Sequence, residues 1–300
     1  MKGVIFICAL VISLGVYAQE DDNTESTPRR HKSKGLQTGL YLGSLFANKF
    51  TAHLYDGYGY GIDGVKNNFP NSFMYEKIIV EYGGGNGQPD QIAQQLNVNP
   101  GEWAFDQSDM PINMKYNPAF TVGLQARWLT KKKYAVLLNA NASKLTLNGN
   151  FTIQLLAPPI GPVQPGFQNL QIFPIIGSEQ RIVIQLGLQR ILGEDEVFNL
   201  IVEGGPLFNM VKFSGNRIVI NGLQIDLMTF YNQYGNEVYR AKNLTGVSFG
   251  AFAGLGVDVN TNARWKIQGV YNPSYEKISL GENQAPKLQH AIGVRVYYDM

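Results

Sequence analysis

The chain has 300 residues and a net charge of +2, and charged residues make up 16% of it, well below the roughly 25% that is usual in soluble domains. Its 33 glycines and its 12% of aromatic residues are high. A nucleic-acid-binding protein needs a concentrated patch of basic residues. The sequence predicts no such patch, so nucleic acid is excluded as a partner. The one basic run, TKKKY at 130–134, is predicted to be a solvated turn.

The first residues form a secretory signal. Lys2 precedes an apolar stretch at 4–16, and small residues lead up to Gln19, a pattern that predicts a signal peptide over 1–18 with cleavage after Ala18. The single cysteine, Cys8, lies inside this segment, so disulfides, thiolate metal ligands and cysteine nucleophiles are excluded from the mature chain. Residues 19–35 are polar and without pattern, and they predict a disordered periplasmic leader.

Eight segments then alternate between apolar and polar or small residues, the period of a β-strand. Each is about 9–11 residues long, which is the length that a tilted strand needs to cross a bilayer. In chain order they cover 36–46, 120–128, 134–143, 181–189, 198–205, 247–258, 264–271 and 289–300. No apolar run reaches the 18 or more residues of a membrane-spanning helix.

The connections between these segments alternate in length. Short ones lie around 131–133, 193–197 and 260–263, whereas the long or irregular ones cover 48–117, 157–180, 214–245 and 281–285. In a membrane barrel the short turns are periplasmic and the long loops are extracellular. The pattern therefore predicts an even number of strands and places the N- and C-termini in the periplasm.

Aromatic residues mark the two ends of the apolar face. Five lie at strand ends next to a short turn or the C-terminus, and are predicted to be lipid-interface aromatics: Trp128, Tyr134, Phe198, Trp265 and Tyr298. Four more occupy the opposite ends of that face: Phe46, Phe120, Phe249 and Tyr271. Two aromatic rings around an apolar band are typical of membrane barrels. The predicted fold is all-β, an eight-stranded antiparallel transmembrane β-barrel over 36–300, with ten strands as the alternative and with short helices in long extracellular loops.

The polar face of the strands would line the barrel interior. It carries five charged residues that we expect to pair in a lumen charge network: Arg127, Glu203, Asp258, Lys266 and Arg295. An eight-stranded barrel is just wide enough for side chains to fill it, so a plugged interior is favoured over a proton or ion path.

The long loops are where function is expected. In loop one (48–117), Asn71 or Ser72 before an apolar run and Pro89 before another predict two short helices that cap the barrel. Loop two (157–180) and loop three (214–245) carry apolar side chains that predict a partner-binding surface, packing onto the other loops being the alternative. The residues are Ile160, Val163, Phe167, Ile172, Phe173, Ile175, Ile176, Phe230 and Tyr231.

Catalysis is not expected. His53, with Asp56 three residues later, is the one histidine placed to act as a base, and no serine partner is evident. No set of histidine and acidic residues has the spacing of metal ligands, so neither a metal nor a cofactor is predicted.

The chain resembles the small OmpA/OmpX-like outer-membrane barrels and, more narrowly, the PorT-like outer membrane β-barrel group of Bacteroidota. The resemblance rests on the VYAQ processing site, the composition rich in Asn, Tyr and Gly, and the large loops. It implies a place in a Gram-negative outer membrane, among lipid, and insertion by the barrel-assembly machinery, whose recognition signal the terminal strand resembles. Some members serve type IX secretion and gliding.

Taken together, these features predict a non-enzymatic anchoring and interaction subunit whose loops bind a partner protein, with a secretion or surface-assembly complex as the candidate assembly. A small uptake or ligand-binding barrel gated by the loop cap is the alternative. An outer-membrane enzyme that modifies lipid is a weaker one.

Overall fold

The computed structural model describes residues 35–300 except 62–64, 131–132, 162–168, 194–196, 232–236, 240–244, 262–263, 279 and 281–284. The predicted signal peptide, and all of the predicted leader except Gly35, lie outside the described residues. So do Val163 and Phe167 of the predicted partner-binding set.

Eight antiparallel strands close into a ring. They are β1 (Gly35–Phe46), β4 (Ala119–Leu129), β5 (Tyr134–Leu155), β6 (Leu170–Leu192), β7 (Phe198–Ile220), β11 (Thr245–Asn260), β12 (Trp265–Glu276) and β13 (Lys287–Asp299). The last strand pairs with the first, from Gln37 opposite Asp299 to Phe46 opposite His290. Closure leaves no barrel edge unpaired. The predicted eight-stranded fold is confirmed, and the ring does not have ten strands.

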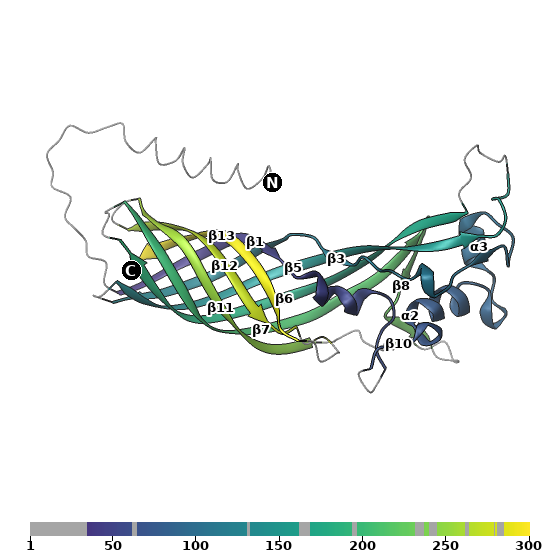
Figure 1. Cartoon of the computed structure of the whole chain (residues 1–300), viewed down its shortest axis with the longest axis horizontal. Coiled ribbons are helices and arrows are strands. Elements are labelled where there is room, and N and C mark those ends of the chain that lie inside the picture. Colours follow the sequence, from purple (N-terminus) through teal and green to yellow (C-terminus); the bar gives the residue numbers. More distant parts are fainter. Residues whose placement is uncertain are drawn as a thin grey trace. The chain divides into compact units, whose positions relative to one another are not determined.

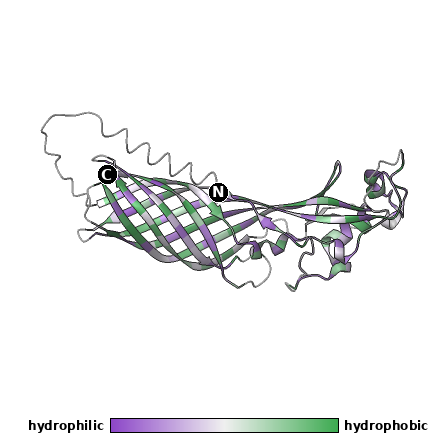
Figure 2. Ribbon diagram, turned by 45° about the horizontal axis from the view of Figure 1, so that its top comes forward, coloured by the Kyte–Doolittle hydropathy of each residue, from purple (hydrophilic) through white to green (hydrophobic). Residues whose placement is uncertain are grey.

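The outside of the ring is apolar and its inside is polar. Hydrophobic and hydrophilic residues alternate along the barrel strands (Figure 2). Large apolar side chains such as Leu40, Leu124 and Leu188 are more than half exposed, while Gln125, Asn139 and Gln268 are buried. A closed sheet that exposes leucine and buries amides is arranged for a hydrocarbon solvent. The chain is therefore a transmembrane β-barrel.

Three strands are about twice as long as the others. β5 has 22 residues, and β6 and β7 have 23 each, whereas the other five barrel strands have 11 to 16. β5 and β6 pair without interruption from Tyr134 opposite Arg190 to Gln154 opposite Leu170. The predicted boundaries of loops two and three were wrong, because 170–180 belong to β6 and 214–220 belong to β7.

Beyond the barrel, these three strands form a sheet that other short strands join. β8 (Leu223–Asp226) pairs with β7, while β2 (Trp103–Ala104) and β3 (Lys115–Tyr116) pair with β5. β9 (Thr229–Tyr231) and β10 (Glu237–Tyr239) pair with each other. We call this sheet, together with residues 49–116, the lobe. The barrel end beside it is the lobe end, and the other is the turn end. Figure 1 shows β5, β6 and β7 running from the barrel toward the helices.

The helices of the lobe are short and belong to loop one. They are η2 (Lys49–Tyr55), η3 (Phe69–Asn71), α2 (Phe73–Tyr75), η4 (Glu76–Glu81), η5 (Gly85–Gly87), α3 (Gln91–Leu96) and η6 (Gln107–Asp109). Ser72 caps α2 by accepting a hydrogen bond from the Tyr75 amide at 3.1 Å, as expected of that residue type. Asp90 caps α3 in the same way, with the Ala93 amide at 2.8 Å.

None of the helices among the described residues is long and apolar enough to cross a membrane.

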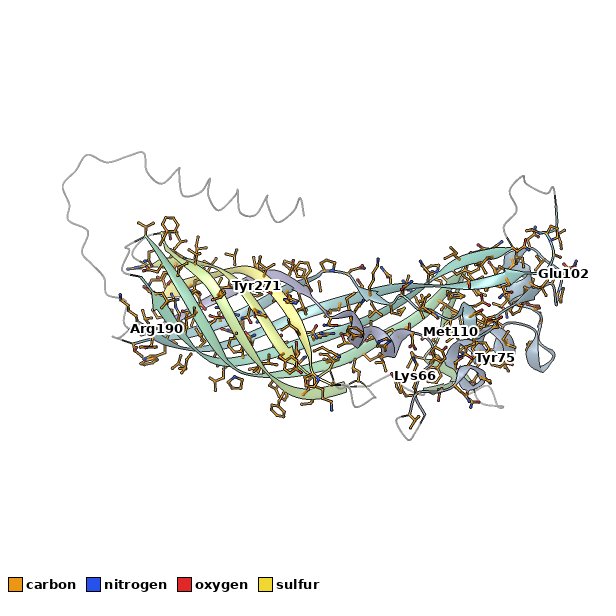
Figure 3. The ribbon with its side chains drawn as sticks, viewed as in Figure 1. Lys66, Tyr75, Glu102, Met110, Arg190 and Tyr271 are labelled. Atoms are coloured by element: carbon orange, nitrogen blue, oxygen red, sulfur yellow. The ribbon has the colours of Figure 1, made fainter. Side chains whose placement is uncertain are left out.

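Loop one covers one face of the lobe sheet and forms a hydrophobic core with it. Phe151 of β5 is buried between two other rings, 6.3 Å from that of Phe105 and 5.7 Å from that of Phe173. Ile78 and Ile92 of the loop are fully buried in the same core. The sheet has buried Ile175 and Ile218 on this face. The lobe thus has a core of its own outside the barrel. Figure 3 shows the side chains of the lobe, with Lys66, Tyr75, Glu102 and Met110 of loop one labelled.

Candidate functional site

An ion pair lies at the centre of the barrel interior. Arg295 donates two hydrogen bonds to Glu203, one to each carboxylate oxygen, and both are 2.7 Å long. Glu203 also accepts from the amides of Gln189 at 2.9 Å and Asn272 at 3.2 Å. Two further donors satisfy the carboxylate, as a buried charge requires. The ion pair therefore crosses the lumen, and both oxygens of the Glu203 carboxylate are hydrogen-bonded.

A second pair lies beside the first. Arg127 is fully buried, and its Nη1 is 3.4 Å from Asp258 Oδ2 and 3.0 Å from Gln189 Oε1. It also donates to Gln37 and lies 4.5 Å from the centre of the Tyr297 ring. The structure thus brings together four of the five predicted lumen charges, and Lys266, half-buried near the turn end, lies within electrostatic range of Arg127 and Asp258. The bridging amides Gln37 and Gln189 were missed, although both lie on the predicted inward face.

The interior is filled by these side chains. The cavity found in the lumen has a volume of about 40 Å³ and is bordered by Tyr41, Gln185 and Arg295 among others. A cavity of this size holds at most a few water molecules, since one water needs roughly 10–15 Å³ of volume open to its centre. Among the described residues, buried side chains thus occupy most of the barrel interior.

A third cluster of buried charge joins the barrel to the lobe. Arg181 donates from Nε to Glu179 at 2.6 Å, and both residues lie on β6 and are buried. Tyr55 and Tyr116 of loop one donate to the same Glu179 carboxylate, at 2.8 and 3.2 Å. Burial, and then the nearby Glu179 carboxylate, raises the pKa of Tyr55 and of Tyr116 well above the ordinary value. Both phenols therefore stay protonated as donors, which fixes loop one onto β6.

Sequence reasoning missed this cluster because it ended loop two at residue 180. The signal was present, since Glu179 and Arg181 share the inward parity of Gln185 and Gln189 on β6.

The predicted partner-binding residues divide between the two faces of the lobe sheet. Ile172 is 66% exposed, whereas Phe173 is 5% exposed and Ile175 is fully buried. Phe173 and Ile175 are therefore corrected to core residues, because loop one covers their face of β6. Ile160 is exposed and Ile176 is half-buried. Phe230 and Tyr231 lie in β9, opposite Val238 and Glu237 of β10.

The face of the lobe sheet that loop one does not cover is exposed. Its central strand, β6, presents an apolar stripe of Leu170, Ile172, Pro174 and Ile176. The neighbouring residues on β5 are polar: Thr146, Asn148, Asn150 and Thr152. We call this surface the open face.

Basic residues border the open face on its barrel side. A groove of about 530 Å³ runs there from Lys144 to Arg217 and includes Asp226 of β8. Lys212 is exposed on β7, opposite Gln180. Positive charge thus exceeds negative charge along this border.

The Asp56 carboxylate is paired with Lys66 and Tyr58 rather than with His53. The Asp56 side chain is almost buried, and it is held by Lys66 Nζ at 2.5 Å and by the Tyr58 amide at 3.1 Å (Figure 3 labels Lys66). No hydrogen bond joins it to His53 within the described part of the chain. Across the same residues there is no group of three or more histidine, cysteine or acidic side chains placed to hold a metal ion.

Asp56 gives the lobe a pH-dependent stability. Burial raises the pKa of Asp56, and the hydrogen bond and charge of Lys66 lower it in part. Because the folded pKa lies above the unfolded value of about 3.9, the stabilisation that this group contributes is complete below that pH and is lost as the pH rises. We expect the unfolding free energy of the wild type minus that of Asp56→Asn to fall as the pH is raised above about 4. Urea unfolding of the lobe over a pH series measures it, and a difference that grows with pH would contradict the assignment.

The predicted lipid-interface aromatics lie on the outside of the barrel at the turn end. Trp128, Phe198 and Trp265 are each about half exposed. Trp265 and Tyr298 face each other across neighbouring strands, with ring centres 5.0 Å apart. Tyr134 is also exposed, and the guanidinium of Arg190 lies 5.5 Å from its ring centre. At the lobe end, Phe46, Phe120, Phe249 and Tyr271 are exposed on the same apolar face.

Comparison with known proteins finds similar structures but no related sequence. No family model matches the chain, and no curated protein matches it either. Among solved structures, Ail, the attachment invasion locus protein of Yersinia pestis, is 10% identical with a TM-score of 0.36, and the match covers 88% of this chain and 98% of Ail. Neisserial surface protein A is 6% identical with a TM-score of 0.38, covering 88% and 96%.

A third similar structure is the outer membrane protein AlkL, which is 8% identical with a TM-score of 0.30, and the match covers 93% of each chain. These three are small outer-membrane barrels. At such low similarity they carry no argument about activity, so the functional proposal rests on the geometry described above.

Proposed function

We propose that the chain is an outer-membrane anchor that presents the lobe outside the cell and binds a partner protein there. The observation that carries the proposal is the continuity of β5, β6 and β7 from the barrel into the lobe. Long loops of a membrane barrel would otherwise be the mobile part of the fold. Here the strands and the Glu179 cluster hold the lobe to a filled barrel, an arrangement suited to presenting a surface.

The orientation follows from the connections. Short links join β4 to β5, β6 to β7 and β11 to β12 at the turn end. The start of β1 and the end of β13 lie at the same end of the barrel. Because short turns of outer-membrane barrels face the periplasm, the proposal places the turn end there and the lobe outside.

The open face is the proposed binding surface. Exposed isoleucines such as Ile172 in a stripe with polar residues around it are suited to a protein interface, whose centre is apolar and whose rim is polar. The border formed by Lys144, Lys212 and Arg217 selects an acidic surface, because complementary charge steers association. The proposed occupant is therefore a protein with an apolar strip beside acidic residues. The resemblance to the PorT-like group supports a component of a secretion or surface-assembly complex.

Replacing Ile172 by aspartate is expected to abolish this interaction, because it buries a carboxylate in the apolar centre of the interface. A photo-reactive residue at position 172 should crosslink one partner, which is then purified and titrated against the wild-type chain in mild detergent. We expect the Kd to rise by at least about tenfold on Ile172→Asp, the equivalent of 1.4 kcal/mol.

The matched control is Val65→Asp, which adds the same charge at an exposed apolar residue of loop one. It should leave the Kd unchanged. Equal losses in both variants, or a partner that crosslinks only from position 65, would refute the open face as the binding surface. Steady conductance in planar bilayers would instead favour the uptake barrel.

A further inference from the structure

A pocket beside the barrel rim shares Asn148 and Asn150 with the edge of the open face, but the partner binding proposed above does not depend on these two residues. It has a volume of about 650 Å³ and lies between residues 49–56, residues 111–115 and β5 at 148–150. This is within the range of roughly 300–1,000 Å³ of small-molecule sites. Three kinds of side chain line it: the cations or titratable bases Lys49, Lys115 and His53, the apolar Phe50 and Ile112, and the amides Asn113, Asn148 and Asn150.

The pocket lies at the edge of the apolar band. Residues 49–56 directly follow β1, whose last lipid-facing side chain is Phe46, and residues 111–115 lead into β4, whose first is Phe120. β1 and β4 are neighbouring strands, and Ser44 lies opposite Phe120 in their register. Both chain segments that wall the pocket therefore leave the barrel side by side, next to the headgroup layer of the membrane.

The pocket carries positive charge that no described residue neutralises in an ion pair. The ammonium groups of Lys49 and Lys287 lie 5.5 and 5.0 Å from the centre of the Phe50 ring. Lys115 is exposed and lies opposite Asn148 of β5. Among the described residues, none of these three lysines forms an ion pair.

The one carboxylate that lines the pocket already has a cationic partner. Asp56 is paired with Lys66, as described above. An anion that enters the pocket therefore meets the ammonium groups of Lys49 and Lys115 and no free carboxylate, while Lys287 adds positive charge beside Phe50. Lysine ammonium groups bind phosphate as point charges.

The remaining surface of the pocket suits a sugar. Phe50 is 50% exposed, so its ring presents an apolar face. The three asparagine amides provide hydrogen-bond donors and acceptors side by side, as hydroxyl groups require. We propose that this pocket binds a phosphorylated sugar, and its place at the edge of the apolar band points to the headgroup of a membrane glycolipid as the source.

The test uses the purified full chain in neutral detergent and three probes: monophosphoryl lipid A, the same lipid without its phosphate, and soluble glucosamine 1-phosphate. Dissociation constants come from calorimetric titration. We expect the phosphorylated lipid to bind at least about tenfold more tightly than its dephosphorylated form, since charge-assisted contacts are lost with the phosphate. The variant K49Q/K115Q should show a similar loss for the phosphorylated lipid.

The control variant K133Q/R190Q removes the same charge from exposed residues at the turn end, and it should bind within about twofold of the wild type. If soluble glucosamine 1-phosphate binds with the same dependence on Lys49 and Lys115, the site stands and its ligand is a soluble phosphosugar. Equal losses in both double variants, or no preference for phosphate, would overturn the proposal. Ile172→Asp leaves this pocket intact, so the two proposals fail independently.

Discussion

Replacing Glu203 by alanine is expected to destabilise the barrel by about 3–5 kcal/mol, because it leaves the buried Arg295 guanidinium without its counter-charge. Arg295 is 1% exposed and meets Glu203 in two 2.7 Å hydrogen bonds, so the guanidinium loses its charged partner at a position that bulk water does not reach. Reversible urea unfolding in lipid vesicles, followed by tryptophan fluorescence, measures the loss.

A double variant separates the cost of an orphaned charge from the contribution of the pair. Glu203→Gln with Arg295→Met removes both charges and keeps one acceptor oxygen, for either Gln189 or Asn272, so we expect most of the stability to return. Lys212→Ala, at an exposed lysine of β7, serves as the control and should change stability by less than about 0.5 kcal/mol. A double variant as unstable as Glu203→Ala would show that the shape of the side chains, rather than the balance of buried charge, determines the stability of the barrel.

Replacing Phe151 by alanine is expected to destabilise the lobe by about 3–5 kcal/mol while the barrel stays closed, since a buried aromatic side chain leaves a large cavity. Phe151 is 1% exposed and packs between Phe105 of loop one and Phe173 of β6. The residue is far along β5 from the barrel pairings with β4, which end at Ser143. The lobe should therefore open locally.

Limited trypsin digestion should detect this opening. Loop one contains Lys66 and Lys77, and cleavage there should become much faster in Phe151→Ala, while the gel mobility of the folded barrel is unchanged. Phe120→Ala is the matched control, because that ring is 65% exposed on the lipid face. If both variants are cleaved at the wild-type rate, the lobe core is not what holds loop one in place.

The barrel could be predicted from the sequence because a bilayer imposes a simple pattern. β1 and β4 begin and end within one residue of the segments predicted at 36–46 and 120–128. Each barrel strand has lipid on one face and polar side chains on the other, so its alternation is strict. The inward parity of Arg127 and Arg295 could be predicted for the same reason.

The lobe could not be predicted, because β6 is apolar on both of its faces there. Phe173 and Ile175 face the core while Ile172 and Ile176 lie on the open face, and Pro174 between them is atypical of a strand interior. Without alternation, the stretch resembles a proline-rich loop. The bridging roles of Gln37 and Gln189 were also hidden, since they depend on the register in which the ring closes rather than on any local pattern.

The uninterrupted pairing of β5 with β6, together with the pairing of β6 with β7 on both sides of a bulge at Ser178 and Glu179, also has a mechanical consequence. A tension applied by a bound partner at the far end of the lobe acts along the strand axes, at right angles to the hydrogen bonds between the strands. Such a load shears many hydrogen bonds at once, whereas a pull on a flexible loop would peel them one after another. The strands that form the open face therefore transmit this load directly to the wall of the barrel.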